Sequence, residues 1–245
     1  MNDAQPLMTI LIPAYNEAVR LPATLERTLA FVDGCAEPLE VLVVNNNSHD
    51  ATREVADRFA ATHASLRVVD QPVQGKGAAV RKGVFEARGR YIFICDADLA
   101  MPIEELARFF PQNLGGAYDI AIGSREAPGA QRFNEPHYRH LMGRVFNFVV
   151  RTLAVPRIQD TQCGFKSLRR EVAREIFAVQ RIDGWAFDVE VLAIAQRWGY
   201  QILEVGIPWY YGEGSRINPL RDAVRMVGEV WRVRRNVRGG LYDKS

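Results

Sequence analysis

Short apolar runs alternate with helical patterns through the first 125 residues, and this alternation constrains the fold more than any other feature of the sequence. The apolar runs occupy 8–13, 39–44, 66–70, 91–98 and 119–125, and the helical patterns between them occupy 17–32, 50–62, 77–87 and 104–110. Uninterrupted apolar runs of this length, bounded by turn residues, are typical of parallel strands that are buried on both faces. We therefore predict an α/β fold with an open, mostly parallel sheet flanked by helices on both faces.

The second half of the chain is less regular. We expect helices at 138–153, 170–177 and 188–198, a loop at 159–164, two short strands within 201–210 and a final helix at 219–237. Neither an internal repeat nor a low-complexity linker divides the chain. The sequence therefore predicts a single domain over 1–245.

Composition excludes several classes of protein. The chain has 31 Lys or Arg and 29 Asp or Glu residues, a net charge of +2, which argues against coating nucleic acid. No stretch approaches the ~18 apolar residues of a membrane-spanning helix, and the start, with Asp3 and no basic residues, does not resemble a signal peptide. Three widely spaced cysteines favour a reducing compartment. We therefore expect a cytoplasmic enzyme.

Polar residues follow the predicted strands at the points where they end. These residues are Pro13, Ala14, Tyr15 and Glu17 after the first run, Asn45 and Asn46 after the second, Asp96, Ala97 and Asp98 after the fourth, and Arg125 after the fifth. The carboxyl ends of parallel strands meet at one edge of a sheet, where ligands bind. We expect these residues to form one site.

Asp96 and Asp98 are the candidate metal ligands. Two carboxylates separated by one residue at a strand end can hold one Mg²⁺ or Mn²⁺ ion and leave positions open for phosphate oxygens. The alternative is that Asp98 caps the helix that begins near Pro102.

Basic residues provide candidate phosphate contacts. Gly75-Lys76-Gly77 precedes a helix, where backbone N–H groups and the lysine could approach a phosphate, although a plain tight turn explains the glycines equally well. Arg125, Arg139 and Arg144 supply guanidinium groups that suit phosphate recognition; a solvated helix face is the alternative for the last two.

These motifs resemble the family 2 glycosyltransferases of the GT-A fold. IPAYNE (12–17), the Asn-rich turn with Ser48, Asp50 and Thr52, GKGAAVRKG (75–83), DAD (96–98) and GSR (123–125) carry the general resemblance. DTQCGFK (160–166), WAFDVE (185–190) and IPWYYGEGSRI (207–217) are similar to the eukaryotic dolichyl-phosphate β-glucosyltransferases.

The resemblance implies that the enzyme transfers a hexose to a polyprenyl phosphate with inversion at the anomeric carbon. The hexose would be glucose and the donor UDP-glucose. Residues 1–125 would then bind the nucleotide sugar and 126–215 the acceptor. Pro13, Ala14, Tyr15, Glu17, Asn45, Asn46, Lys76, Asp96, Ala97 and Asp98 would contact the donor, with Mg²⁺ or Mn²⁺ on Asp96 and Asp98. Arg125, Arg139, Arg144, Gln162, Trp185 and Asp188 would contact the acceptor, and Asp98, Asp160 and Arg125 would be catalytic.

The sequence departs from the family in the turn after the second run. Asn45-Asn46-Asn47-Ser48 stands where the family has Asp-Asp-Gly-Ser. An asparagine carbonyl can accept the nucleobase N–H bond that an aspartate accepts, without the charge, so nucleobase recognition is retained.

A phosphate acceptor needs no general base, because its second pKa of ~6 leaves it anionic at neutral pH. A hydroxyl acceptor would need one, and Asp160 is then the first candidate, before Asp188 and Glu190. Mannose or N-acetylhexosamine transfer, a non-lipid acceptor and a non-catalytic nucleotide-sugar-binding protein are the alternatives.

The final segment, 216–245, is strongly basic. It has eight Arg or Lys residues against three Asp or Glu residues. Leu220, Ala223, Val224, Val227 and Val230 give it one apolar face, and Arg221, Arg225, Arg232 and Arg235 share another. Such a helix could lie on an anionic membrane surface. Packing on the enzyme and dimerisation are the alternatives, so an oligomer is compatible with the sequence.

Overall fold

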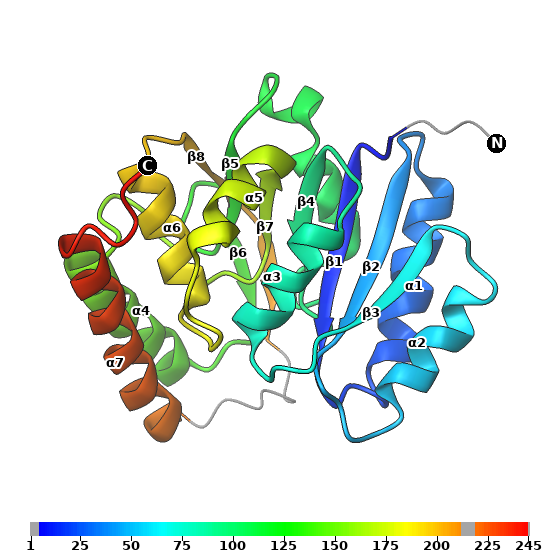
Figure 1. Ribbon diagram of the computed structural model, residues 1–245, viewed down its shortest axis with the longest axis horizontal. Helices are drawn as coiled ribbons and strands as arrows, with labels where there is room; N and C mark the ends of the chain where they lie inside the picture. Colours follow the sequence, from blue (N-terminus) through cyan, green and yellow to red (C-terminus); the bar gives the residue numbers. More distant parts are fainter. Residues whose placement is uncertain (1–4, 212–218, 245) are drawn as a thin grey trace.

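The chain folds around one seven-stranded sheet. The computed structural model describes residues 5–211 and 219–244, and only the backbone of 219–225. The strand order is β3-β2-β1-β4-β7-β5-β8 (Figure 1). The bounds of the strands are β1 Met8–Ala14, β2 Leu39–Asn45, β3 Leu66–Asp70, β4 Tyr91–Ile94, β5 Ile120–Ser124, β7 Lys166–Arg169 and β8 Ile202–Gly206. β6 (Gln131–Phe133) and β9 (Pro208–Tyr210) form a separate parallel pair.

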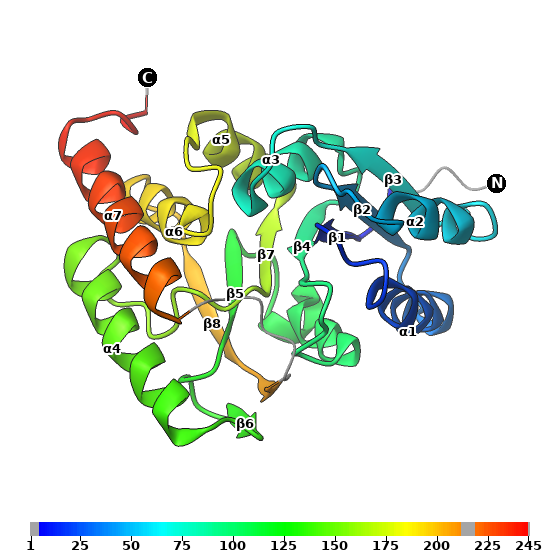
Figure 2. The ribbon, with the colours of Figure 1, turned by 90° about the horizontal axis from the view of Figure 1, so that it is seen from below.

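Helices cover both faces of the sheet, as the apolar runs predict. In β1, Met8, Ile10 and Ile12 belong to one core cluster and Leu11 to the other, so both faces of the strand are buried. α1 (Leu21–Gly34) and α2 (Thr52–Ala60) cover the first face; α3 (Lys76–Glu86), α5 (Arg170–Val179) and α6 (Phe187–Arg197) cover the second (Figure 2). The predicted α/β fold is confirmed.

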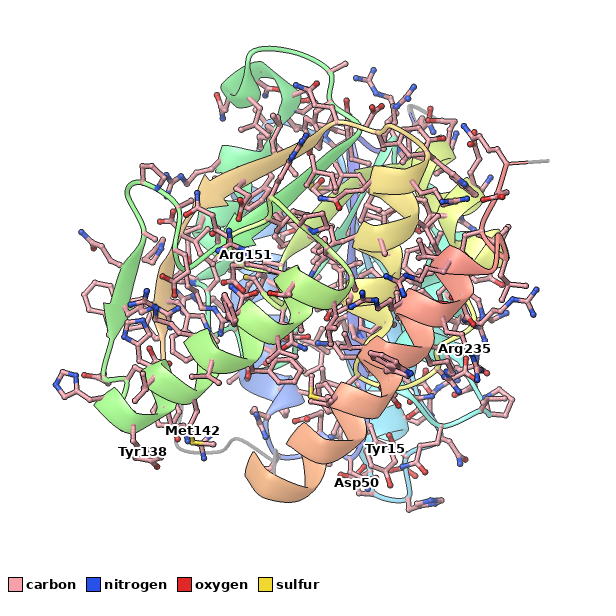
Figure 3. The ribbon with its side chains drawn as sticks, turned by 90° about the vertical axis from the view of Figure 1, so that its left-hand side faces the viewer. Tyr15, Asp50, Tyr138, Met142, Arg151 and Arg235 are labelled. Atoms are coloured by element: carbon pink, nitrogen blue, oxygen red, sulfur yellow. The ribbon has the colours of Figure 1, made fainter. Side chains whose placement is uncertain are left out.

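Two long helices pack together beside the second face. α4 (His137–Leu153) and α7 (Pro219–Arg238) lie side by side and contact each other (Figure 3). Val230 and Val233 of α7 are fully buried in the core, so this helix is docked on the enzyme body. Of the apolar and basic residues predicted to line its two faces, Leu220, Arg221, Ala223, Val224 and Arg225 have side chains outside the described residues.

Two predicted helices differ from those observed. The first begins at Leu21 rather than residue 17, because Asn16 has a φ of 53° and the N–H groups of Glu17 and Ala18 donate to the side chains of Thr52 and Asp50. The segment predicted as a helix at 104–110 is a 3₁₀ helix, Ile103–Phe109, which ends one residue before Phe110 because Pro111 disfavours a helical conformation there.

The sequence prediction missed two strands, β6 and β7, of which β7 belongs to the main sheet. It runs antiparallel between β4 and β5, in the middle of the sheet. Its residues Lys166 and Ser167 are buried, and tertiary partners satisfy them: Asp188 pairs with the lysine, and Tyr118 hydrogen-bonds the serine at 2.7 Å. Because these two residues are polar, the sequence of this central strand lacks the apolar pattern by which a buried strand is recognised.

No helix within 5–211 and 219–244 is long and apolar enough to cross a bilayer. All three cysteines, Cys35, Cys95 and Cys163, are free thiols, as predicted.

Candidate active site

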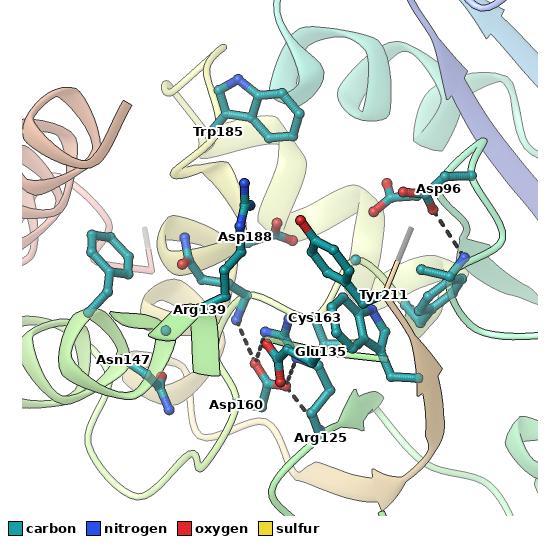
Figure 4. Close-up of a pocket in the computed structure, with 18 of the residues that line it drawn as sticks. Asp96, Arg125, Glu135, Arg139, Asn147, Asp160, Cys163, Trp185, Asp188 and Tyr211 are labelled. Atoms are coloured by element: carbon teal, nitrogen blue, oxygen red, sulfur yellow. Dashed lines mark hydrogen bonds and ion pairs between the residues drawn. The ribbon is translucent and has the colours of Figure 1, made fainter. Parts of the chain in front are cut away.

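A cavity of about 410 Å³ opens beyond the carboxyl ends of β4 and β5 (Figure 4). Figure 4 shows Asp96 on one side of it and Arg125 with Asp160 on another. The cavity brings together nine residues singled out from the sequence, which are Lys76, Asp96, Asp98, Arg125, Arg139, Asp160, Gln162, Trp185 and Asp188.

The carboxylate pair follows β4. Lys76 Nζ lies 2.6 Å from Asp96 Oδ1, and the Ala100 N–H donates to Asp98 Oδ1 at 3.1 Å. Burial and the neighbouring Asp96 charge raise the pKa of Asp98. Burial lowers the pKa of Lys76, but the carboxylates around it, Asp96 first, outweigh burial and hold its pKa above the ordinary value.

The donor set of this pair fits a divalent cation. Burial and the Asp96 charge disfavour ionisation of Asp98, and a cation bound between the two carboxylates would offset that repulsion. The described part of the chain has no cluster of three or more His, Cys, Asp or Glu side chains suited to a metal. The remaining ligands of an ion at Asp96 and Asp98 would have to come from a bound substrate. The bond to Ala100 shows that Asp98 also stabilises a local turn, which begins well before the 3₁₀ helix.

A glycine from the second half of the chain packs directly on this pair. A Cβ atom on Gly164 would lie 2.0 Å from Asp96 Oδ2, closer than any side chain could fit. The DTQCGFK loop and the DAD motif therefore meet at one point.

Arg125 and Asp160 form a bidentate ion pair in which the carboxylate is buried and the arginine is half-buried. Asp160 Oδ2 accepts from Arg125 Nε at 2.7 Å and from its backbone N–H at 3.0 Å, and Oδ1 accepts from Nη2 at 2.9 Å. Burial would raise the pKa of Asp160, but the guanidinium outweighs burial and lowers the pKa to about 2. A carboxylate this acidic and this fully engaged is a poor proton acceptor, which argues against the general-base role that we ranked first for Asp160.

The other two candidate bases are also engaged. Asp188 lines the cavity and pairs at 2.7 Å with Lys166, which also donates to the Cys163 carbonyl. Glu190 is fully buried behind the site and accepts the N–H groups of Arg181 and Ile182. Glu190 therefore has a structural role.

Arg139 reaches the cavity from the first turn of α4. Its guanidinium lies 5.4 Å from the Tyr211 ring, and its buried Nε has no hydrogen-bond partner among the described residues. Arg144, one of the three predicted acceptor arginines, is exposed on the same helix and does not line the cavity.

The donor-side motifs lie at the ends of β1 and β2, next to this cavity and outside its lining. Ser48 Oγ accepts the Asn16 N–H at 3.0 Å, and Thr52 and Asp50 accept the next two N–H groups. The polar residues after β2 therefore hold the loop that follows Pro13 and Ala14 of β1 and carries Tyr15 and Glu17.

Asn45 and Asn46 have separate partners. Asn45 Nδ2 donates to Asp70 Oδ1 at 2.8 Å, while its buried Oδ1 has no hydrogen-bond partner among the described residues. Asn46 accepts the Gly75 N–H at 2.8 Å and donates to the Val73 carbonyl at 2.7 Å. Asn45 thus keeps an acceptor for a ligand donor, and Asn46 anchors the loop before α3.

The glycines beside Lys76 do not leave a phosphate cradle. The Gly77 N–H donates to the Asp183 carbonyl at 2.8 Å, and a Cβ on either Gly75 or Gly77 would clash with backbone atoms of 182–183. The predicted backbone contact with a phosphate is therefore wrong for these N–H groups. The lysine side chain alone points into the cavity.

Sequence reasoning missed several lining residues, among them Arg20, Glu135, Phe146, Trp209 and Tyr211. Trp209 is the central residue of β9. In the structure its ring lies 5.4 Å from the Arg125 guanidinium, on the cavity wall. The run of three aromatic residues at 209–211 was the signal available for Trp209 and Tyr211.

An open, mostly parallel sheet with a carboxylate pair at the end of β4, facing a cavity with basic groups, defines a glycosyltransferase of the GT-A class. The model of "Glycosyl transferase family 2" matches residues 9–177, and the chain belongs to this family.

Curated relatives agree with the family assignment. The chain is 33% identical to "Dolichyl-phosphate beta-glucosyltransferase ALG5C" of Trichomonas vaginalis, over 96% of this chain and 72% of that protein. It is 35% identical to the Mus musculus dolichyl-phosphate beta-glucosyltransferase, over 89% of this chain and 72% of that protein. The predicted resemblance is confirmed.

A solved structure shares the fold. Glucosyl-3-phosphoglycerate synthase from Mycobacterium tuberculosis, in complex with Mn²⁺, UDP-glucose and phosphoglyceric acid, superposes with a TM-score of 0.67 at 17% identity, covering 96% of this chain and 80% of that one. The superposition confirms the GT-A architecture.

Proposed function

We propose that this glycosyltransferase moves glucose from UDP-glucose, with inversion at C1, to the phosphate of a polyprenyl phosphate. The observation that carries the proposal is the placement of two kinds of group around one cavity. The carboxylates Asp96 and Asp98 lie on one side, and the guanidinium groups of Arg125 and Arg139 lie on another. A donor diphosphate with its cation and an acceptor phosphate can thus be bound at the same time. The curated relatives are named for this reaction class.

The donor would bind along the ends of β1, β2 and β4. The unpartnered Asn45 Oδ1 would accept a base N–H. Pro13 and Ala14 at the end of β1, with Tyr15 and Glu17 in the loop after it, would flank the nucleoside. Asn46 and Ala97 would shape the pocket from behind. Asp96 and Asp98 would hold Mg²⁺ or Mn²⁺, which supplies charge stabilisation to the departing nucleoside diphosphate. Lys76 adds a fixed positive charge beside Asp96.

The acceptor phosphate would bind at Arg139 and on the edge of Arg125 that Asp160 leaves open. Asp160 accepts from Nε and Nη2 of Arg125, which leaves Nη1 to donate to the acceptor phosphate. A phosphate oxygen forms the bond to C1 while the bond from C1 to the diphosphate oxygen breaks. Because the phosphate is already anionic near neutral pH, no proton has to be removed. Gln162, Trp185 and Asp188 would line the space for the sugar and the phosphate ester.

Transfer to a hydroxyl is less well supported. It needs a carboxylate base, and the candidates Asp160, Asp188 and Glu190 are held by Arg125, Lys166 and backbone N–H groups respectively. A phosphate acceptor fits this arrangement of charges better. A mannosyl or N-acetylhexosaminyl donor would use the same cavity.

The test is a donor panel with a short-chain prenyl phosphate and Mn²⁺, in which product is separated and its anomeric configuration determined. We expect β-linked glucosyl product from UDP-glucose. Equal use of a sugar hydroxyl acceptor would overturn the choice of acceptor. Absence of both transfer and donor hydrolysis would favour a non-catalytic binding protein.

A further inference from the structure

α4 presents a continuous apolar stripe to solvent. Tyr138, Leu141, Met142, Val145 and Phe148 recur at helical spacing and are between 44% and 70% exposed. Other exposed large apolar residues, such as Val19, Val73 and Phe85, lie singly on separate elements. Scattered residues of this kind are normal on a protein surface, whereas a contiguous set marks an interaction site.

α7 extends the stripe. Val227 and Trp231 are exposed, one helical turn apart, on the helix that packs against α4. Figure 3 shows the two helices side by side, with Tyr138 and Met142 projecting from the lower end of α4. We call Tyr138, Leu141, Met142, Val145, Phe148, Val227 and Trp231 the α4–α7 surface.

Positive charge borders the α4–α7 surface. Exposed arginines on the two helices are Arg144, Arg151, Arg232, Arg235 and Arg238. The sequence of α4 has no acidic residue at all. In the part of α7 whose side chains are described, Glu229 is the acidic residue, and it accepts the Ala186 N–H at 3.1 Å, toward the enzyme body.

The combination of exposed apolar side chains with bordering arginines distinguishes between two possible partners of this surface, a second copy of the chain and a lipid bilayer. A second copy of the chain packed on the α4–α7 surface through a two-fold axis would bring the same arginines close together without carboxylates to pair them. An anionic bilayer would receive the apolar side chains at its acyl boundary and the arginines at its headgroup phosphates. We propose that the α4–α7 surface lies on the headgroup region of an anionic lipid bilayer.

The surface continues into the catalytic cavity. Met142 belongs to both, and Phe146 and Met226 line the cavity from the same two helices. This step rests on the proposed function: an acceptor phosphate could reach Arg139 while its prenyl chain stays in the lipid beside α4. The sequence prediction assigned membrane contact to the final helix, whereas five of the seven side chains that define the α4–α7 surface come from α4.

The test is co-sedimentation of the full chain with vesicles of phosphatidylcholine alone and of phosphatidylcholine mixed with phosphatidylglycerol. The variant L141S/V145S/F148S removes three exposed side chains outside the cavity lining, so it is expected to fold. F85S, in α3, is the matched control for loss of an exposed phenylalanine. We expect binding to the mixed vesicles that falls about tenfold or more in the triple variant and is unchanged in F85S.

Three results would overturn the proposal. The first is failure of the unmodified chain to bind the mixed vesicles, and the second is an equal loss of binding in F85S. The third is a dimer in light scattering that the triple variant abolishes, which would make a second copy the occupant. Glycosyl transfer to a water-soluble short-chain prenyl phosphate, measured on the same samples, tests the proposed function separately. The triple variant should retain this transfer activity if it has lost only the membrane binding of the α4–α7 surface.

Discussion

Gly164 lies against Asp96 so closely that a methyl group at its Cα would sit 2.0 Å from Asp96 Oδ2. The glycine comes from the loop before β7 and the aspartate from the end of β4, 68 residues earlier in the chain. The absence of a side chain at 164 therefore sets the position of a proposed metal ligand.

Gly164→Ala should displace Asp96 and weaken Mn²⁺ binding by about tenfold, with a loss of about 1–3 kcal/mol in stability from the overlap. Isothermal titration with Mn²⁺ and UDP measures the first effect, and denaturant unfolding measures the second. Gly228→Ala is the control, because a Cβ there meets nothing within 4 Å. In that helix alanine should stabilise by about 0.5–1 kcal/mol. Unchanged Mn²⁺ affinity in Gly164→Ala would show that Asp96 is not a ligand.

Asp98→Asn should reduce transfer on the order of a hundredfold or more, since a neutral amide binds a divalent ion far less well than a carboxylate. Initial rates at a series of Mn²⁺ concentrations measure this change. Asp57→Asn removes an exposed carboxylate that pairs with Arg53 four residues away, and it should leave the rate unaltered. If Asp98→Asn retained full activity at low Mn²⁺, the metal assignment would have to be abandoned.

Asp160→Asn should cost about 2–3 kcal/mol of stability, because it leaves the half-buried Arg125 guanidinium without its counter-charge. The pKa of Asp160 is lowered to about 2 in the folded chain, against ~3.9 unfolded. The pair's contribution is therefore complete at neutral pH, begins to fall below about pH 5 and is lost as the pH approaches 2.

Urea unfolding of both proteins between pH 7 and pH 3 checks this pH dependence. The difference between their free energies of unfolding should be constant near pH 7 and become smaller towards pH 3. A difference that grows as the pH falls would contradict the ion pair, and Asp160→Glu should recover part of the stability at pH 7.

Arg139→Ala should raise the KM for a prenyl phosphate by about tenfold, the value of one charged hydrogen bond to phosphate, and leave the KM for UDP-glucose unchanged. Arg144→Ala is a matched control from the same helix, because Arg144 is exposed and lies outside the cavity lining. Steady-state kinetics with each substrate varied in turn separates the two constants. Equal effects of the two substitutions would place the acceptor phosphate elsewhere.

The parallel strands of the sheet could be predicted because burial of their faces requires runs of apolar residues, which can be recognised in the sequence. β7 could not, since Lys166 and Ser167 are buried only because Asp188 and Tyr118 lie opposite them in the fold. A periodicity argument uses only the residues of the strand itself. It therefore cannot include these partners, which are distant in sequence.

The same distinction holds for the site. Asp96, Asp98 and Arg125 were found because they follow strands, and a sheet edge brings strand ends together. The role of Asp160 could not be found, because its engagement by Arg125, 35 residues away, depends on how the loop folds back. Arg20 reaches the cavity from a turn and Trp209 from the short strand β9, which pairs outside the main sheet, so no local pattern places either side chain there.

The central position of β7 has a consequence for how the chain acquires its structure. β5 pairs only with β7 and β8 in the sheet, and both of these strands come later in the sequence. Until Lys166–Arg169 has emerged from the ribosome, β5 has no neighbour and the exposed edge of β4 is open. Residues 1–125 therefore cannot form the complete sheet when they are separated from the rest of the chain. The sheet is completed late in folding, through long-range strand pairing of the kind that slows folding.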